Sequence, residues 1–155
     1  MTKLKFDIGQ ESGKVEIKIV GHLDENFIQN EHTIPAGVLV KFNLEKLEGI
    51  NSCGIREFIN LLKRIPSETQ VEYHHCPPFF IQQVNIVNGF LASNRKIASL
   101  YVPYVCVESE KEVTQFIVAT NLTISGVQKT ITINGEAYEF DGFIDKYFRF
   151  LTIKF

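Results

Sequence analysis

One segment of the chain, from residue 38 to residue 66, constrains the fold more than any other. It begins with an apolar, partly β-branched run at 38–44, which predicts a buried strand. A short loop at 49–55 follows, and apolar residues then recur at helical spacing until Pro66 ends the pattern. A strand that leads through a tight loop into an amphipathic helix predicts an α/β protein, and the helix is expected to bury Ile55, Phe58, Ile59, Leu62 and Ile65.

The loop places polar residues at the start of this helix. Asn51 or Ser52 is expected to be the N-cap, because either side chain can accept a hydrogen bond from a backbone N–H of the first turn. The free N–H groups and the helix dipole would also stabilise an anion at this point. Any strand-to-helix turn has these properties, so a purely structural role for the loop stays open beside a binding role.

Composition narrows the class of protein. A chain of 155 residues predicts one domain with room for an appendage. The formal net charge of −2 argues against non-specific binding to nucleic acid or to an anionic membrane. No apolar run approaches the length of a membrane span, and the three cysteines lie far apart, as is typical of reduced thiols. The sequence therefore predicts a cytoplasmic protein without a nucleic-acid or membrane partner.

The remaining elements around the central segment predict a mixed β-sheet flanked by helices. Alternating and apolar runs indicate the strands, and caps and prolines indicate the helices. The expected strands are 4–8, 15–19, 71–76 and 100–106, and the expected further helices are 24–32 and 79–89. The order along the chain supports an α/β core over residues 1–106, with the first two strands forming a hairpin.

The composition changes after Cys106, which predicts a small β-rich appendage at 107–155. Asn134-Gly135 is typical of a type I′ turn and predicts a hairpin over 130–140. Asp141 is then expected to cap a short closing helix. The hairpin should present Ile131, Ile133, Tyr138 and Phe140 on one face.

The run His74-His75-Cys76 contains residue types that bind zinc. Adjacent strand residues point to opposite faces, so His74 and His75 cannot converge on one ion. His74 and Cys76 share a face, but no further ligand is apparent. We therefore expect a structural role for this run and no metal.

Four short segments together resemble a known family in their order and spacing. They are Gly21-His22-Leu23-Asp24, Leu47 to Ile55, Val71 to Pro78, and Phe80 to Leu91. Residues from about 13 to 106 resemble a STAS domain, the fold of anti-sigma-factor antagonists and of sulphate-transporter tails. The resemblance implies a STAS-like mixed sheet flanked by helices and a bacterial signalling module that regulates transcription by protein binding, without catalysis or cofactor.

The resemblance also implies where a partner binds. An anti-sigma-factor or kinase-like protein is expected on the loop and helix at Asn51 to Arg64, through Asn51, Ser52, Cys53, Gly54 and Arg56. In the family, a serine or threonine just before the loop glycine is phosphorylated, and an aspartate opens the loop. Here Cys53 and Asn51 stand at those positions, so the phosphorylation switch is expected to be lost. Ser52 remains as a neighbouring acceptor, and a homodimer stays open.

The C-terminal part resembles a degenerate zinc ribbon. Residues 103–109, 139–141 and 146–151 carry this likeness. A ribbon needs two C-x-x-C knuckles, but here the first reads Cys106-x-x-Ser109 and the second falls near Ile131-x-x-Asn134. With one thiolate of four, the appendage is expected to bind no stoichiometric zinc.

Two other functions remain open from the residues. A helix N-terminus lowers the pKa of a thiol, so Cys53 is a conceivable nucleophile, although no histidine is placed by sequence to act as its base. The same helix N-terminus is a conceivable small-molecule or nucleotide site, although no phosphate-cradling glycine pattern is present. An interaction module is the preferred interpretation.

Overall fold

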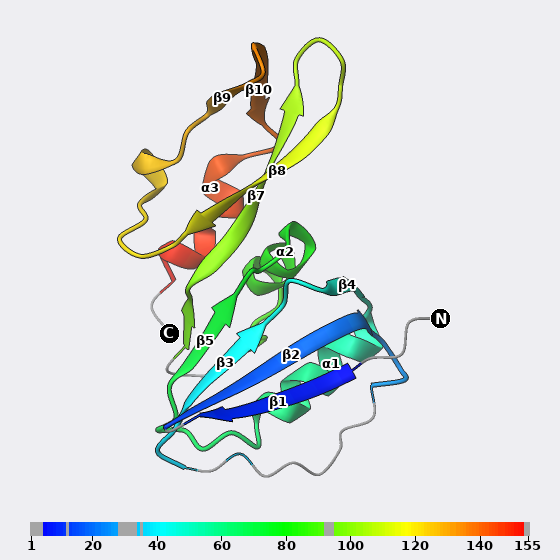
Figure 1. The fold of residues 1–155 in the computed structure, drawn as a ribbon, viewed down its shortest axis with the longest axis vertical. Coiled ribbons are helices and arrows are strands. Elements are labelled where there is room, and N and C mark those ends of the chain that lie inside the picture. The colour runs from blue at the N-terminus through cyan, green and yellow to red at the C-terminus, as the bar shows by residue number, and fades with distance from the viewer. Residues whose placement is uncertain (1–4, 12, 28–33, 35, 92–94, 154–155) are drawn as a thin grey trace.

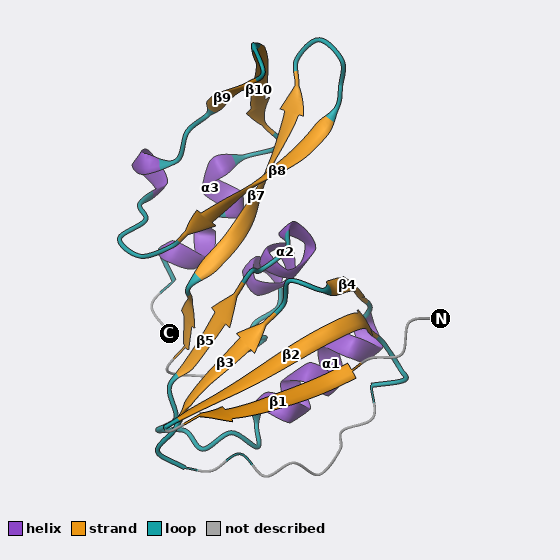
Figure 2. Ribbon diagram, in the orientation of Figure 1, coloured by secondary structure: helices purple, strands orange, loops and turns teal. Residues whose placement is uncertain are grey.

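The computed structural model describes residues 5–11, 13–27, 34, 36–91 and 95–153. Within this part of the chain the protein is mixed α/β, with two β-sheets and three α-helices (Figures 1 and 2). The first sheet and two helices come from the N-terminal part of the chain, and the second sheet and the third helix come from the C-terminal part. The expected α/β class is therefore confirmed.

The first sheet has the strand order β1-β2-β3-β5-β6, and β4 pairs with β2 as well. The expected N-terminal hairpin is confirmed, because β1 and β2 are antiparallel, whereas every other pairing in this sheet is parallel. β2 is the shared strand: its first half pairs with β3 and its last residues pair with β4. The strands are β1 (Lys5–Glu11), β2 (Lys14–Leu23), β3 (Leu39–Asn43), β4 (Leu47–Ile50), β5 (Val71–His74) and β6 (Arg95–Ile97).

Two helices supply the other half of the first core. α1 (Ser52–Leu62) lies behind β1 and β2 in the view of Figure 1, and α2 (Pro78–Ile86) follows β5. Pro78 occupies the first turn of α2, where a missing N–H costs no helical hydrogen bond. The strands and both helices meet in a buried aromatic cluster, whose members are Phe42, Phe58, Tyr73, Phe80 and Phe90.

The strand expected at 100–106 forms, but it does not belong to the first sheet. β7 (Ser99–Cys106) pairs with β8 (Glu112–Val118) and β10 (Glu136–Phe140), and a single bridge from Leu100 to Cys76 links it to the first sheet. An alternating pattern predicts a strand but does not specify its neighbour, which is why the sequence misplaced it. The domain boundary near residue 106 stays a prediction.

The second sheet is antiparallel, with the order β8-β7-β10-β9. The hairpin of β9 (Thr130–Ile133) and β10 is confirmed, and its turn residues Asn134 and Gly135 both adopt positive φ angles of 51° and 82°. These angles are those of the predicted type I′ turn. Tyr138 lies opposite Ile131 and is buried, as the expected apolar face requires.

The closing helix is shorter than expected and begins later. α3 (Ile144–Tyr147) has Phe143 at its N-cap, so the expected cap at Asp141 is wrong. The N–H of Asp141 donates to the carbonyl of Pro103 at 3.0 Å, which keeps residue 141 tied to β7 before the chain turns into the helix. Two 3-10 turns complete the C-terminal part, η1 (Ile124–Gly126) and η2 (Arg149–Leu151). The helix expected at 24–32 lies mostly outside the described residues.

A pair of hydrogen bonds from one amide holds the two parts together. Asn85 of α2 donates from Nδ2 to the carbonyl of Tyr147 at 2.7 Å and accepts from the N–H of Phe150 at 3.0 Å through Oδ1. The hydroxyl of Tyr147 donates in turn to the carbonyl of Tyr101 in β7 at 2.6 Å. Burial raises the pKa of this hydroxyl, so it stays protonated and keeps donating.

We predict that Asn85→Ala lowers the free energy of unfolding by about 2 kcal/mol, because it leaves the Tyr147 carbonyl and the Phe150 N–H without their partner. Urea denaturation of the two proteins measures the difference. Asn88→Ala is the matched control, since Asn88 is exposed just after the same helix, and it should change stability by less than about 0.5 kcal/mol. Equal losses in both variants would contradict the docking role of Asn85.

Candidate functional site

The loop between β4 and α1 is held by the predicted N-cap residue. Asn51 accepts a hydrogen bond from the N–H of Gly54 at 2.9 Å through Oδ1, which confirms it as the N-cap of α1. Its own N–H donates to the carbonyl of Leu23 at 3.0 Å, and its Nδ2 donates to Glu25 Oε2 at 2.9 Å. One side chain and one backbone group of Asn51 thus join the helix, the end of β2 and the segment after β2.

Gly54 brings α1 into direct contact with the end of β2. A Cβ atom at this position would lie 1.9 Å from the carbonyl oxygen of Leu23, far inside van der Waals contact. The neighbouring atoms are backbone atoms, which cannot rotate away as a side chain would. Gly54 is buried, so its role is packing, and it presents no side chain to a partner.

The other predicted site residues reach the surface. Asn51, Ser52 and Arg56 are exposed, and Cys53 is half-buried. The Arg56 side chain is 69% exposed and pairs with Glu57 at 3.1 Å between Nε and Oε1. Four of the five predicted residues are therefore at least partly accessible at the start of α1, and Gly54 is not.

Sequence reasoning missed the acidic residues beside this terminus. Glu25 sits against Asn51, and its own backbone N–H and the Asn51 amide lower the pKa of its carboxyl group. His22 and Glu48 approach within 3.5 Å on the strands that lead to the loop. Glu25 and Asn51 are 26 residues apart, and no sequence pattern connects them.

The Glu25 carboxylate changes which ligands the N-terminus of α1 can bind. The N–H of Gly54 is already satisfied by Asn51, and Glu25 supplies a negative charge where the helix dipole is positive. An incoming phosphate would meet that charge at short range. The geometry thus disfavours a nucleotide at this terminus, although the terminus alone had suggested an anion.

No hydrogen bond joins Cys53 to a histidine in the described part of the chain. Each described histidine has a contact with another side chain, and His32 lies outside the described residues. These contacts are His22 with Glu48 at 3.5 Å, His74 with Glu72 at 2.9 Å, and the His75 ring with the Phe116 ring at 5.0 Å. A Cys–His pair would need the imidazole within hydrogen-bonding distance of the thiol.

No group of three metal-ligating side chains occurs among the described residues. The expected strand at 71–76 ends at His74, because His75 adopts a left-handed φ of 55°. Cys76 is buried, and burial raises the pKa of its thiol, which disfavours the thiolate that a metal needs.

The two segments that the sequence compares with zinc knuckles lie at the same end of the second sheet. Tyr138 pairs with Cys106, so the turn at 134–135 and the turn after Cys106 are neighbours. Hydrogen bonds from Ser109 and from the backbone of Glu108 lower the pKa of the Cys106 thiol.

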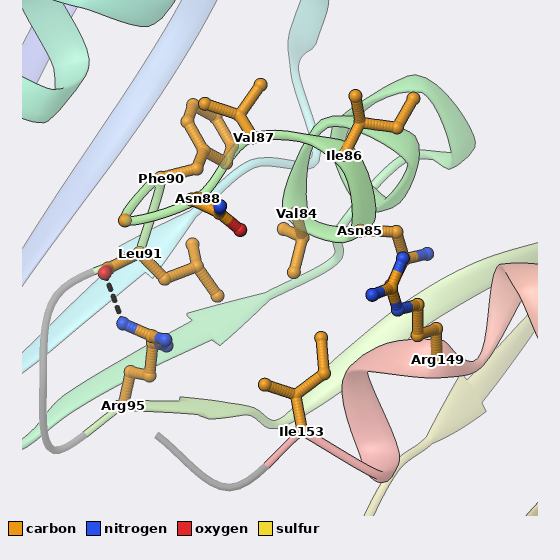
Figure 3. Close-up of a pocket in the computed structure, with 11 residues that line it drawn as sticks. Val84, Asn85, Ile86, Val87, Asn88, Phe90, Leu91, Arg95, Arg149 and Ile153 are labelled. Atoms are coloured by element: carbon orange, nitrogen blue, oxygen red, sulfur yellow. Dashed lines mark hydrogen bonds between the residues drawn. The ribbon is translucent and has the colours of Figure 1, made fainter.

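Two pockets lie away from the loop. One, of about 420 Å³, is lined by the C-terminal end of α2 together with Arg95, Arg149 and Ile153 (Figure 3). Arg95 donates a hydrogen bond there to the carbonyl of Leu91. The other, of about 370 Å³, lies between α2 and residues 140–149. Neither is lined by a residue of the loop at 50–54.

No protein-family model matches the chain, and no curated protein sequence matches it. None of the helices in the described ranges is both long enough and apolar enough to cross a membrane.

Gly54→Ala should lower the free energy of unfolding by about 3 kcal/mol or more, because the new Cβ meets the Leu23 backbone. Helix propensity alone would predict the opposite sign, a gain of about 1 kcal/mol. Gly49→Ala is the control in the same segment, since its Cβ would meet the exposed His22 ring, which can move, and it should cost less than about 1 kcal/mol. Thermal and urea denaturation compare the variants, and a stabilised Gly54→Ala protein would refute the contact.

We also predict that protein purified without chelator contains no stoichiometric zinc, because Ser109, Ile131 and Asn134 supply no thiolates beside Cys106. Elemental analysis by mass spectrometry measures the metal per chain. Near-equimolar zinc that Cys106→Ser abolishes would show that the ribbon still binds metal.

Proposed function

We propose that this protein is a non-enzymatic, STAS-like interaction module that binds a regulatory protein of the anti-sigma-factor or kinase-like kind. The binding surface is the loop and helix from Asn51 to Arg64. One observation carries the proposal: the Asn51 cap and the Gly54 contact fix the helix terminus against β2, while Ser52 and Arg56 are exposed and Cys53 is half-buried. A surface held in one conformation loses little entropy on binding.

The charges along α1 indicate the chemistry of the partner. Arg56 is exposed on the polar side of the helix, where it pairs with Glu57, and Lys63 and Arg64 are exposed just after the helix ends at Leu62. The apolar side of α1 packs on the core. Glu25 adds a negative charge at the N-terminal end. A partner with acidic groups along the helix and a polar, uncharged group opposite Cys53 complements this surface.

The STAS-like assignment is part of the proposal. The order of β4, the loop and α1, and the mixed sheet covered by helices, support it for residues from about 13 to 106. The proposal also includes a role in cytoplasmic signalling, as the resemblance implies.

Binding is proposed to be constitutive. Cys53 stands where the family carries its phosphorylated residue, and a thiol is not a substrate for a serine kinase. Ser52 is exposed, but it follows Asn51, whose amide binds the Glu25 carboxylate, so a phosphate on its hydroxyl would add negative charge to a helix terminus that already carries one. Like-charge repulsion therefore disfavours a phosphorylation switch at this loop.

A small-molecule function has one observation in its favour, the 420 Å³ pocket lined by Arg95 and Arg149 (Figure 3). Its volume is in the range of ligand sites, and two guanidinium groups suit an anionic ligand. Thermal shift with a panel of nucleotides and carboxylic acids tests this alternative. A shift lost in Arg149→Gln would favour it over the interaction module.

Cys53→Asp should weaken partner binding by about 3 kcal/mol, because the interface would leave the new charge desolvated and without a counter-ion. The partner is captured from an extract of the source cells with the wild-type chain as bait. Calorimetry with the purified partner then measures both affinities.

Cys53→Ser is the matched control, since it changes one atom and adds no charge, and its affinity should equal that of the wild type. Circular dichroism confirms that both variants fold. An Asp variant that binds as tightly as the wild type would place the interface elsewhere on the molecule.

A further inference from the structure

β8 forms an open edge of the second sheet. The strand order places it at one end, with β7 as its neighbour. An edge strand presents a row of unpaired N–H and C=O groups that can pair with another strand. Natural proteins protect such edges with charged residues, proline, bulges or short strands. An edge strand without these features is therefore a candidate for pairing with another chain.

Two hydrogen bonds show which backbone N–H and C=O groups of β8 point away from β7. The N–H of Cys106 donates to Lys111 at 2.8 Å, and the N–H of Ala119 donates to Ala98 at 2.9 Å, both in the register of the β7–β8 pair. In an antiparallel pair the bonded residues alternate, so the odd-numbered residues of β8 bond to β7. The even-numbered ones point their backbone groups outward, and these four residues are Glu112, Thr114, Phe116 and Val118.

The same four residues also expose their side chains, whereas the odd-numbered side chains are half-buried. Phe116 is 45% exposed and Val118 is 59% exposed. The rings of His75 and Tyr101 lie 5.0 and 5.5 Å from the Phe116 ring, between centroids. An apolar, partly aromatic face therefore adjoins the open edge.

This edge lacks the usual protective features. Glu112 is the one charged residue of β8 and stands at its first position; no charged residue and no proline occurs from Val113 to Thr120, and the register with β7 is unbroken along β8. The edge strand β1, by contrast, carries Lys5, Asp7 and Glu11, and the edge strand β9 has four residues. β8 is thus a seven-residue edge whose last six residues carry no charge.

We propose that β8 pairs antiparallel with β8 of a second copy of this chain, across a twofold axis at Gln115. In this register Thr114 faces Phe116 of the second copy, and Glu112 faces Val118. All four outward residues are then paired, whereas a register centred on Phe116 would leave Glu112 unpaired.

A second copy fits this edge for two reasons. The twofold pairing opposes no like charges, and it joins strands of equal length so that no open β8 edge remains. The net charge of −2 adds little repulsion between copies. The proposal does not depend on the binding surface at Asn51 to Arg64.

Sedimentation equilibrium of the full chain tests the dimer. The mass should rise from 17.7 kDa towards twice that value as the concentration increases. Thr114→Pro removes one outward N–H from each copy and spares the bonds to β7, so it should weaken dimerisation at least about tenfold. Thr114→Val keeps the N–H and should dimerise like the wild type.

Phe116→Lys places a charge on the edge and should also weaken the dimer, even if the proline variant fails to fold. A cysteine pair tests the register. Gln115→Cys in a Cys53→Ser background should form a disulfide-linked dimer on oxidation, because residue 115 of one copy faces residue 115 of the other. Val113→Cys in the same background should form no linked dimer, because residue 113 faces Ile117 of the second copy.

Three results would overturn the proposal. The first is a chain that sediments as a single 17.7 kDa monomer at every concentration. This result would overturn the proposal even if the monomer bound an extended peptide of another protein. The second is a dimer that neither Thr114→Pro nor Phe116→Lys weakens. The third is a dimer in which Gln115→Cys forms no link, which would exclude the register at Gln115.

Discussion

The candidate site depends on the close approach of α1 to the carbonyl of Leu23. Gly54 permits that approach because it has no Cβ, and the Asn51 N–H donates to the same carbonyl. These two contacts fix the helix terminus against β2, the strand that joins both halves of the first sheet. The position of Cys53 on the surface therefore follows from backbone packing, and a larger residue at 54 would move the whole helix.

A second constraint connects the two sheets. The chain passes from β6 to β7 through Ala98, and Asn85 of α2 binds the backbone of Tyr147 and Phe150 in the C-terminal segment. The loop before α1 follows β4 of the first sheet, whereas β8 is an edge strand of the second sheet, and the two lie in different parts of the molecule (Figure 1). Partner binding and self-association, as proposed, would therefore use separate surfaces.

The accuracy of the sequence predictions followed the range of the interactions. Asn51 as an N-cap, Pro78 in a first turn and Asn134-Gly135 as a hairpin turn were predicted correctly, because each depends on a few adjacent residues. Asp141 failed as a cap because its backbone binds Pro103, which is distant in sequence. β7 was predicted as a strand, but its sheet was not.

The sequence by itself determined the α/β class, the strand at 38–44 and the helix capped by Asn51, since these follow from local periodicity and capping, but it did not predict β4 (Leu47–Ile50) between them. The tertiary structure decided that Glu25 meets Asn51, that Gly54 packs on Leu23, and that β8 is left as an unguarded edge. These three facts depend on contacts between segments that are distant in the sequence and meet only in the folded protein. Side-chain pattern reports which face of an element is apolar, but it does not report which element covers that face.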